Sequence, residues 1–293
     1  MLYRVRSVNQ MPTDVSSSLV KFQVDGSVLG KVTPTMVDRL VQTPVFEIDG
    51  QGMLTLSREA GDTCESRTEA VQTVMKDLRS ENVIKGWRDE LYPITTNFYE
   101  DPAFLMERAA VPILGGVEYG VHINGLVKKA DGKELMWMAR RSKTKSKYPG
   151  MLDHMAAGGQ PAGYGVLENV AKECFEEAGI PEELTLAGIK PAGAISYETF
   201  EAPKDCVSRA VLFCFDLWLP EDFKPRPVDG EVEEFFLWDI EQIKESMDRE
   251  FDDPIKPNCY PVIIDFLLRF GHISPDTPGY LDILRELRGG ECR

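Results

Sequence analysis

The chain has 293 residues, of which 43% are hydrophobic and 28% charged, and its formal net charge is −15. This composition is typical of a soluble globular protein, and the length fits one large domain or two ordinary ones. An acidic chain is poorly suited to broad contact with nucleic acid or with an anionic membrane surface. No apolar run approaches the ~20 residues that a membrane-spanning helix requires. We therefore expect no nucleic-acid partner and no membrane partner.

The N-terminal sequence has no apolar core of the kind that secretory signals contain. The six cysteines form no C-x-x-C pair, which is typical of free thiols in a reducing compartment. They are Cys64, Cys174, Cys206, Cys214, Cys259 and Cys292. With only His122, His154 and His272, a histidine-rich zinc site is not expected. We expect a cytoplasmic protein, although the sequence does not distinguish the cytoplasm from an organelle.

The chain is predicted to divide near residue 110. Residues 1–110 alternate short apolar segments with turns such as Asp25-Gly26 and Asp49-Gly50. Helices are predicted in this unit at residues 65–80 and 102–110. Because the unit concentrates neither carboxylates nor a glycine-rich phosphate loop, we assign it no role beyond that of a small α+β domain.

The second unit, residues 111–293, mixes strands with a few separate helices. Alternating or continuous apolar residues predict strands at residues 119–128, 134–140, 190–197, 208–217 and 233–238. Helices are predicted at residues 166–178, from residue 240 and after residue 261. This order of elements predicts an α+β sandwich rather than a doubly wound sheet.

Residues 158–180 carry the most chemical information. They read GGQPAGYGVLENVAKECFEEAGI, a glycine-rich turn followed by a helix with the carboxylates of Glu173, Glu176 and Glu177. Positions i, i+3 and i+4 share one helix face, so these groups repel one another unless a positive charge lies among them. Mg2+ prefers oxygen ligands and meets that need. Together with the glycine-rich turn, the carboxylates predict a site that handles phosphate.

An acidic helix face is by itself more often a solvated surface than a site. The predicted apolar face of this helix consists of Leu167, Ala171, Cys174, Phe175 and Ala178. The opposite face carries Asn169 and the three glutamates. A site is favoured here because a glycine-rich turn precedes the helix and because residues 140–150, RRSKTKSKYPG, form a strongly basic loop shortly before it.

The stretch resembles the Nudix box, G-x5-E-x7-R-E-U-x-E-E-x-G-U, where U is a bulky aliphatic residue. Gly158 matches the opening glycine, while the three glutamates, Gly179 and Ile180 match the closing half. Gly163 lies where the family often has a glycine. These matches cover the positions that bind metal in the family.

The chain also departs from the box. Tyr164 replaces its first glutamate, Lys172 replaces its arginine, and Cys174 is a soft substitute for U. The first glutamate normally helps to hold the arginine. Glu168 lies four residues before Lys172, in the favourable order for an ion pair, and we expect these two residues to form the replacement pair.

The resemblance continues through the basic loop, the strand at 209–217, the segment DGEVEEF (229–235) and the segment that begins KPNC (256–259). Together they resemble a Nudix subgroup of fungal and plant proteins linked to thiamine diphosphate metabolism. Residues 86–94 and 104–110 resemble the N-terminal domain of that subgroup. The resemblance implies a Nudix α/β/α sandwich, with a mixed sheet between helices, preceded by a smaller α+β domain.

Nudix enzymes typically hydrolyse a diphosphate that is linked to another group, with Mg2+ or Mn2+ as cofactor. The resemblance therefore implies that Glu173, Glu176 and Glu177 are metal ligands and act in catalysis. The main-chain carbonyl of Gly158, or that of a neighbour, is expected to complete the metal's coordination.

A glutamate from a distant loop often binds metal or orients water in the family. Glu231 occupies the matching place, and Glu233 and Glu234 are the alternatives. Strand alternation places Glu231 and Glu233 on one face and Glu234 on the other. We favour Glu231, against the alternative that it is a solvated charge at the edge of the sheet.

Four basic side chains are candidates for binding substrate phosphate: Arg140, Arg141, Lys143 and Lys145. Guanidinium groups suit bidentate contacts with phosphate oxygens. Adjacent residues of a strand point to opposite faces, so only one of the two arginines is expected to face the site. For the lysines, the alternative is that they are solubilising charges of the loop.

The leading hypothesis is a Mg2+-dependent pyrophosphohydrolase acting on thiamine diphosphate or its oxidised analogues, and a homodimer fits the family. The first alternative is hydrolysis of a nucleoside-diphosphate-linked substrate such as ADP-ribose, NADH or an oxidised nucleotide. An isoprenoid-diphosphate isomerase needs a catalytic cysteine, and Cys174 is predicted to face the core. A catalytically silent diphosphate-binding module is the third alternative, because the first glutamate and the arginine of the box are absent.

Overall fold

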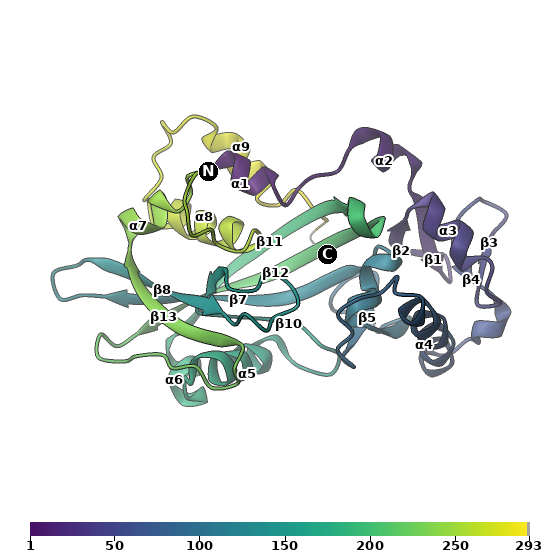
Figure 1. Cartoon of the computed structure of the whole chain (residues 1–293), viewed down its shortest axis with the longest axis horizontal. Helices are drawn as coiled ribbons and strands as arrows, with labels where there is room; N and C mark the ends of the chain where they lie inside the picture. The colour runs from purple at the N-terminus through teal and green to yellow at the C-terminus, as the bar shows by residue number, and fades with distance from the viewer. Residues whose placement is uncertain (292–293) are drawn as a thin grey trace.

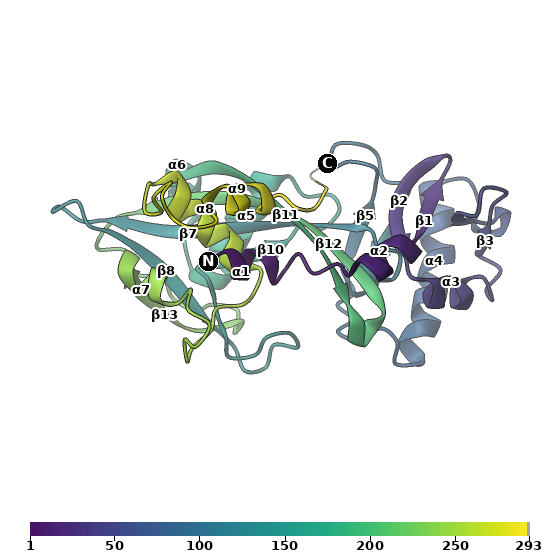
Figure 2. The same ribbon diagram turned by 90° about the horizontal axis from the view of Figure 1, so that it is seen from above.

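Three β-sheets organise the chain, and the structure, a computed structural model, describes residues 1–291 (Figure 1). A four-stranded and a two-stranded sheet lie within residues 20–107, and a seven-stranded sheet is built from residues 117–239. Figure 2 shows the small sheets at one end of the molecule and the large sheet, with its helices, at the other. We call these two parts the N-terminal unit and the large-sheet unit.

The four-stranded sheet has the order β2–β1–β4–β3. Its strands are β1 (Val20–Val24), β2 (Ser27–Val32), β3 (Phe46–Ile48) and β4 (Leu54–Leu56). The hairpin between β1 and β2 turns at Asp25-Gly26, as the sequence predicted. Both turn residues have a positive φ, 51° and 80°, which a two-residue turn of type I′ requires.

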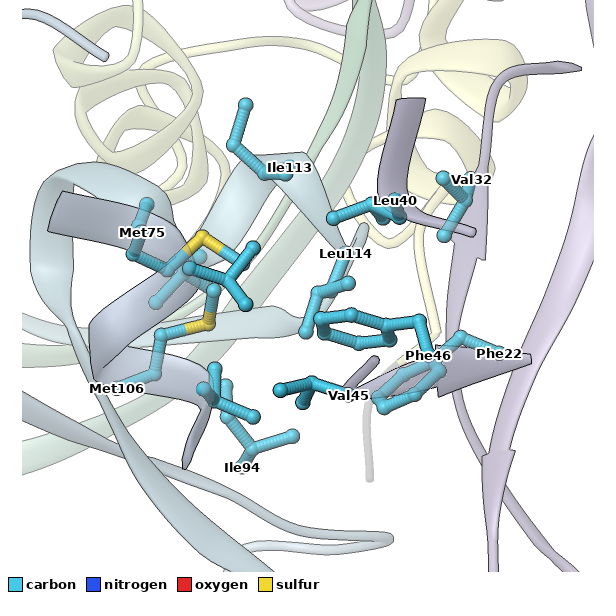
Figure 3. Close-up of a cluster of buried hydrophobic side chains, with 14 of the residues drawn as sticks. Phe22, Val32, Leu40, Val45, Phe46, Met75, Ile94, Met106, Ile113 and Leu114 are labelled. Carbon is cyan, nitrogen blue, oxygen red and sulfur yellow. The ribbon is translucent and has the colours of Figure 1, made fainter. Parts of the chain in front are cut away.

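Helices α3 (Pro34–Leu40) and α4 (Cys64–Ser80) and the short η1 (Arg58–Ala60) belong to the same unit. Helix α4 begins at a capping box formed by Thr63 and Ser66, which satisfies main-chain N–H groups of its first turn. The helix predicted at 65–80 is therefore confirmed. The core of this unit includes the buried side chains of Phe22, Leu40, Met75, Met106 and Leu114 (Figure 3).

The helix predicted at 102–110 is wrong. Residues Phe104–Glu107 form strand β6, which pairs antiparallel with β5 (Leu91–Ile94), and residues Arg108–Ile113 form the 3-10 helix η2. Leucine, methionine, glutamate and alanine favour a helix in isolation. Here the alternating burial of Phe104 and Met106 in the core decides for a strand.

The large sheet has the order β11–β12–β7–β8–β13, with β10 paired to β7 and β9 paired to β8. Strands β7 and β12 run parallel and the other pairs are antiparallel, so the sheet is mixed. The strands are β7 (Val117–Lys128), β8 (Glu134–Arg141), β9 (Leu152–His154), β10 (Ala156–Gly159), β11 (Ile189–Glu201), β12 (Cys206–Leu219) and β13 (Val232–Asp239). All five strands predicted for this unit lie within these ranges.

Helices cover both faces of the large sheet (Figure 1). Helices α5 (Val166–Ala178) and α6 (Glu182–Gly188) lie on one face, and α7 (Ile240–Glu245), α8 (Cys259–Arg269) and α9 (Tyr280–Glu286) lie on the other. Strand β7 supplies both cores by alternation: Val121 and Ile123 pack in the core beneath α5, whereas Leu126 packs in the core beneath α8. The predicted sandwich is confirmed. Within residues 1–291 no helix has the length and apolar character that crossing a membrane requires.

The N-terminal segment joins the two units. Helix α1 (Leu2–Arg6) contacts α8 and α9, and its Val5 is buried in their core; the chain then passes through α2 (Thr13–Ser18) to the small sheet. The hairpin of β11 and β12, with η3 (Ala202–Lys204) at its tip, reaches back to the N-terminal unit. There Glu198 forms a 2.9 Å ion pair with Lys31, and the Thr33 hydroxyl donates to the Asp205 carbonyl oxygen at 3.0 Å.

Candidate active site

The glycine-rich turn and helix α5 form one continuous structure at the edge of β10. Strand β10 ends at Gly159, the turn contains Gly163 with a φ of +87°, and α5 starts after Gly165. The Glu168 carboxylate accepts a hydrogen bond from the Gly165 N–H at 3.2 Å, which caps the helix. The helix ends at Gly179, whose positive φ of 64° allows the closing turn.

Two of the box carboxylates, Glu173 and Glu177, lie on the side of α5 that faces β10. Glu177 is buried and accepts a hydrogen bond from the Ala157 N–H at 2.9 Å. Glu173 is largely buried, and Glu176 is about half exposed. Gly158 leaves the space that Glu173 fills, because a Cβ at this glycine would be 2.1 Å from the Glu173 Cδ.

Burial raises the pKa of Glu173 and raises the pKa of Glu177 well above its ordinary value; the charge of Glu173 adds to the second shift. Although the Lys172 ammonium lies beside Glu173, the buried carboxylates with raised pKa values leave the region short of positive charge. A hard divalent cation with oxygen ligands supplies that charge. The residues present therefore fit Mg2+ or Mn2+, with Glu173, Glu176 and Glu177 to hold it.

Lys172 adopts a different role from the one expected. Its ammonium lies 3.1 Å from a Glu173 oxygen and 2.8 Å from a Glu176 oxygen, and these carboxylates raise the pKa of Lys172 although partial burial opposes the shift. Because Glu168 caps the helix instead, the predicted Glu168–Lys172 pair is wrong. Lys172 thus orients two of the box carboxylates by direct contact.

Glu231 is held opposite the helix by the basic loop. Its carboxylate pairs with the Lys145 ammonium, and its carbonyl accepts from the Ser142 N–H at 2.8 Å. Burial favours the neutral form, yet Lys145 outweighs it and the pKa of Glu231 is lowered. The charge of Glu231 in turn contributes to the raised pKa values of Glu173 and Glu177, so the three carboxylates share one electrostatic environment.

The alternatives to Glu231 are placed differently. Glu233 accepts a hydrogen bond from the main-chain N–H of Lys143 at 3.0 Å, and Glu234 is exposed. A break in the register of β13 between Val232 and Glu234 interrupts the simple alternation that the sequence predicted. The geometry brings Glu231 to the box carboxylates, and its part in catalysis remains a prediction.

Comparison with known proteins agrees with this geometry. Residues 118–259 match the model of the NUDIX domain, and residues 1–118 match DUF4743, a domain of unknown function. Residues 118–259 are a Nudix domain. An N-terminal DUF4743 domain precedes it.

Two curated relatives are similar in sequence to most of this chain. Nudix hydrolase 24, chloroplastic, from Arabidopsis thaliana is 46% identical over 231 residues, which are 79% of this chain and 62% of that protein. The uncharacterized protein YJR142W from Saccharomyces cerevisiae is 39% identical over 216 residues, 70% of this chain and 61% of that protein. The chain thus spans less than two thirds of the length of these relatives.

Solved structures also match part of this chain. The NUDIX domain of Shewanella oneidensis NrtR, complexed with ADP ribose, matches 52% of this chain and 87% of that chain. The TM-score is 0.40 and the sequence identity 11%.

Both arginines predicted to bind phosphate have protein partners in the Nudix domain. Arg140 makes two contacts with Asp253, at 2.5 and 2.6 Å. Arg141 pairs with Asp153 at 2.5 Å and donates to the carbonyls of Lys147 and Tyr148. These contacts fold the basic loop, so the structure does not support either guanidinium as a free phosphate ligand. The contacts of Lys143 and Lys145 with the Glu231 segment leave their role toward substrate a prediction.

The buried face of α5 also differs from the expected one. Leu167 and Phe175, predicted to be apolar core residues, are 49% and 54% exposed, whereas Asn169 is fully buried. The Asn169 amide donates to the Gly159 carbonyl at 2.8 Å and to the Gln160 side chain at 3.1 Å. The helix is therefore rotated toward the polar groups that fix the glycine turn. Cys174, as predicted, is buried in the core.

A cluster on the α8 side of the sheet was not expected from the sequence. His122 and His154 approach with their Nδ1 atoms 2.9 Å apart, and the Cys259 thiol donates to Asp153 at 2.8 Å. Burial lowers the pKa of both histidines, that of His154 to about 4. The imidazoles are therefore neutral at pH 7. Two features of the sequence point to this contact. His122 lies at an even-numbered position of β7, and Asp153-His154 comes shortly before the glycine turn.

The sequence also missed two side chains of the DUF4743 domain that lie at the glycine turn. A Cβ at Gly159 would be 1.4 Å from the Tyr92 hydroxyl oxygen and 3.4 Å from the Arg108 Cζ. In the sequence, residues 91–94 show only a resemblance to the N-terminal domain of the subgroup. The signal in the sequence is the glycine pair 158–159. Gly158 leaves space for Glu173, and Gly159 leaves space for Tyr92.

Proposed function

We propose that the protein is a Mg2+-dependent Nudix pyrophosphohydrolase that cleaves a diphosphate-linked small molecule to a monophosphate and phosphate. The observation that carries the proposal is the meeting of Glu173, Glu176 and Glu177 at a glycine turn whose Gly158 leaves room for the first of them. A decayed box would be expected to lose such metal carboxylates first.

A bound divalent cation would neutralise charge on the phosphate oxygens and lower the pKa of a bound water. The chain's own residues do the rest. Lys172 orients Glu173 and Glu176, and the Ala157 N–H holds Glu177. Glu231 is ionised at neutral pH, since Lys145 holds its pKa below the ordinary value, and its second carboxylate oxygen accepts the proton of the attacking water. The water oxygen bonds to phosphorus while the bridging P–O bond breaks.

For the substrate we propose thiamine diphosphate or its oxidised analogues. This choice rests on the resemblance of the segments around the box to the thiamine-linked subgroup. Nucleoside-diphosphate-linked molecules such as ADP-ribose are the competing class.

We also propose that the protein acts in a reducing compartment. Among such compartments we favour the cytoplasm over an organelle. Free cysteines at positions 64, 174, 206, 214 and 259 support the reducing environment, and Cys292 lies outside the described residues. The Arabidopsis relatives are named chloroplastic, so fractionation of cells that express a tagged protein is the test that separates the cytoplasm from an organelle.

The test of the activity is release of phosphate and monophosphate from a panel of diphosphates, with Mg2+ and with chelator. The panel contains thiamine, oxothiamine and oxythiamine diphosphates, ADP-ribose, NADH and oxidised dGTP. Turnover that is concentrated on a thiamine-type diphosphate and disappears with chelator is the expected result. Turnover only on nucleotides would replace the substrate class, and no turnover by folded protein would favour a silent binding module.

A further inference from the structure

The DUF4743 domain places a tyrosine hydroxyl directly beside the glycine turn. Tyr92 lies on β5 and is only 2% exposed. The space that a side chain at Gly159 would fill is occupied by the Tyr92 hydroxyl. The main chain fixes this approach, since the Ala162 N–H in the turn donates to the Leu91 carbonyl at 3.1 Å. The position of Tyr92 is therefore fixed by the hydrogen bond of Leu91 with the glycine turn and by the contact of its hydroxyl with Gly159.

The Tyr92 hydroxyl has no hydrogen-bond partner among residues 1–291. A buried hydroxyl without a partner is unfavourable, and most such groups in folded proteins are satisfied by protein, water or ligand. Burial raises the pKa of this hydroxyl, and the charge of Glu173 is among the groups that add to the shift. The donor thus remains protonated and lies in the electric field of a proposed metal ligand.

Arg108, at the start of η2, lies next to this hydroxyl. Its guanidinium carbon is 5.5 Å from the centre of the Tyr92 ring, and its Nη1 donates to Glu90 at 2.9 Å. Within residues 1–291, its Nε and Nη2 donate no hydrogen bond to another residue. The side chain is 42% exposed, so a ligand can reach it.

The charge balance of the site favours a further positive group. Glu173, Glu176, Glu177 and Glu231 are all acidic, and a diphosphate substrate is an anion. Arg140 and Arg141, the expected phosphate ligands, are taken by Asp253 and Asp153. Arg108 is the guanidinium at the glycine turn that keeps donors in reserve, and planar donors of this kind suit phosphate oxygens.

We propose that Arg108 and Tyr92 form a phosphate-binding site that the DUF4743 domain contributes to the Nudix domain. The Arg108 guanidinium binds oxygens of the substrate's diphosphate and the Tyr92 hydroxyl donates to one of them, while Glu90 positions Arg108. This inference rests on the proposed function in so far as the substrate is a diphosphate. It gives the N-terminal domain a direct part in recognition.

The domain also contacts the basic loop, which supports the same arrangement. The Arg88 guanidinium donates to the Ser146 hydroxyl at 2.9 Å, and the charge of Arg88 helps to lower the pKa of Glu231. The N-terminal domain is therefore in contact with the two segments that flank the carboxylates, the glycine turn and the loop. A substrate held by Arg108 would lie between the domains.

The test uses the full chain and the variants Arg108→Met, Tyr92→Phe and Arg39→Met. Arg39 is a matched control, because it lies in the same domain, pairs with Glu81 at 2.9 Å and is 46% exposed, but it is in the last turn of α3, whereas Arg108 lies beside Gly159. Calorimetric titration with inorganic pyrophosphate in the presence of Mg2+ gives the dissociation constant, and kinetics on any diphosphate that the parent hydrolyses gives KM and kcat. Thermal melting verifies that each variant is folded.

We expect Arg108→Met to weaken pyrophosphate binding and to raise KM by about 10- to 100-fold, Tyr92→Phe to do so by about 3- to 10-fold, and Arg39→Met to match the parent. Binding and KM unchanged in folded Arg108→Met would overturn the inference while leaving the proposed hydrolase intact. A parent chain that binds no pyrophosphate would overturn it as well. Weakened binding by Arg108→Met in a chain that hydrolyses nothing would uphold the inference and reject the hydrolase.

Discussion

The carboxylate of Glu173 occupies the space in which a side chain at Gly158 would lie, since a Cβ there would be 2.1 Å from the Glu173 Cδ. The opening glycine of the Nudix box is therefore needed in this chain for space. Its φ lies outside the left-handed region, so the requirement is one of contact rather than of backbone strain.

Gly158→Ala is expected to displace Glu173 and to lower kcat/KM by about 100-fold, because small misplacements of a catalytic group have effects of this size. The measurement is steady-state hydrolysis of the best substrate of the panel. Gly50→Ala is the control, as a Cβ at Gly50 meets no atom within 4 Å. Equal activity of the two variants would show that Glu173 does not need its observed position.

Glu177→Gln is expected to separate stability from activity. The carboxylate is buried beside Glu173 and its pKa is raised well above the ordinary value, so its charge destabilises the metal-free fold. Glutamine keeps the acceptor for the Ala157 N–H and removes that charge. The metal-free variant should therefore melt at a higher temperature than the parent, gain no further stability from Mg2+ and lose about 100-fold or more in activity. Differential scanning calorimetry with and without Mg2+ measures both effects.

The opposite result, a lower melting temperature in the absence of metal, would mean that the Glu177 charge is already compensated within the protein. Glu176→Gln is the comparison, because Glu176 lies on the same helix but its side chain is 45% exposed. Its substitution should change the metal-free stability little.

The sequence predicted those parts of the site that depend on neighbours in the chain. The spacing of Glu173, Glu176 and Glu177 places them on one helix face, and Gly179 ends that helix as expected. The large sheet followed from strand patterns and from the resemblance. These features depend on local periodicity and turn chemistry, which a single sequence carries.

The contacts that the sequence did not reveal join residues far apart in the chain. Arg140 is taken by Asp253, 113 positions away, and the Tyr92 hydroxyl lies against Gly159. The exposure of Phe175 has the same origin, since hydrophobicity favours its burial but Asn169 and Glu177 have polar partners on the inner side. Polar partners of this kind outweigh side-chain hydrophobicity in deciding which side of the helix is buried. The periodicity of the sequence does not reveal them.

The buried pair of histidines predicts a loss of stability in acid. The pKa of His154 is about 4 in the folded protein because burial disfavours its charged form, whereas an unfolded histidine titrates near 6.5. Between these values the unfolded chain binds the proton and the folded chain does not. The titration of His154 therefore leaves the free energy of unfolding unchanged above about pH 6.5. As the pH drops toward 4, it lowers the free energy of unfolding by about 2–3 kcal/mol.

His154→Asn removes that titration, so its melting temperature should fall less than that of the parent between pH 6.5 and 4.5. Thermal melting across this range is the measurement, and His272→Asn controls for the loss of a histidine elsewhere. Parallel curves for the parent and His154→Asn would mean that His154 accepts a proton in the folded state as readily as in the unfolded one.

Glu231→Gln tests the residue that the geometry selects from three. Its carboxylate pairs with Lys145 and shares the environment of Glu173, whereas Glu234 on the same segment is exposed. If Glu231 accepts the proton of the attacking water, glutamine at this position should lower kcat by about 100- to 10,000-fold and change KM little. The acid limb of the pH–rate profile, which would report deprotonation of Glu231, should also disappear from the residual activity. Glu234→Gln should retain the parent's kcat and profile, and a larger loss in Glu234→Gln or Glu233→Gln than in Glu231→Gln would transfer the role to that residue.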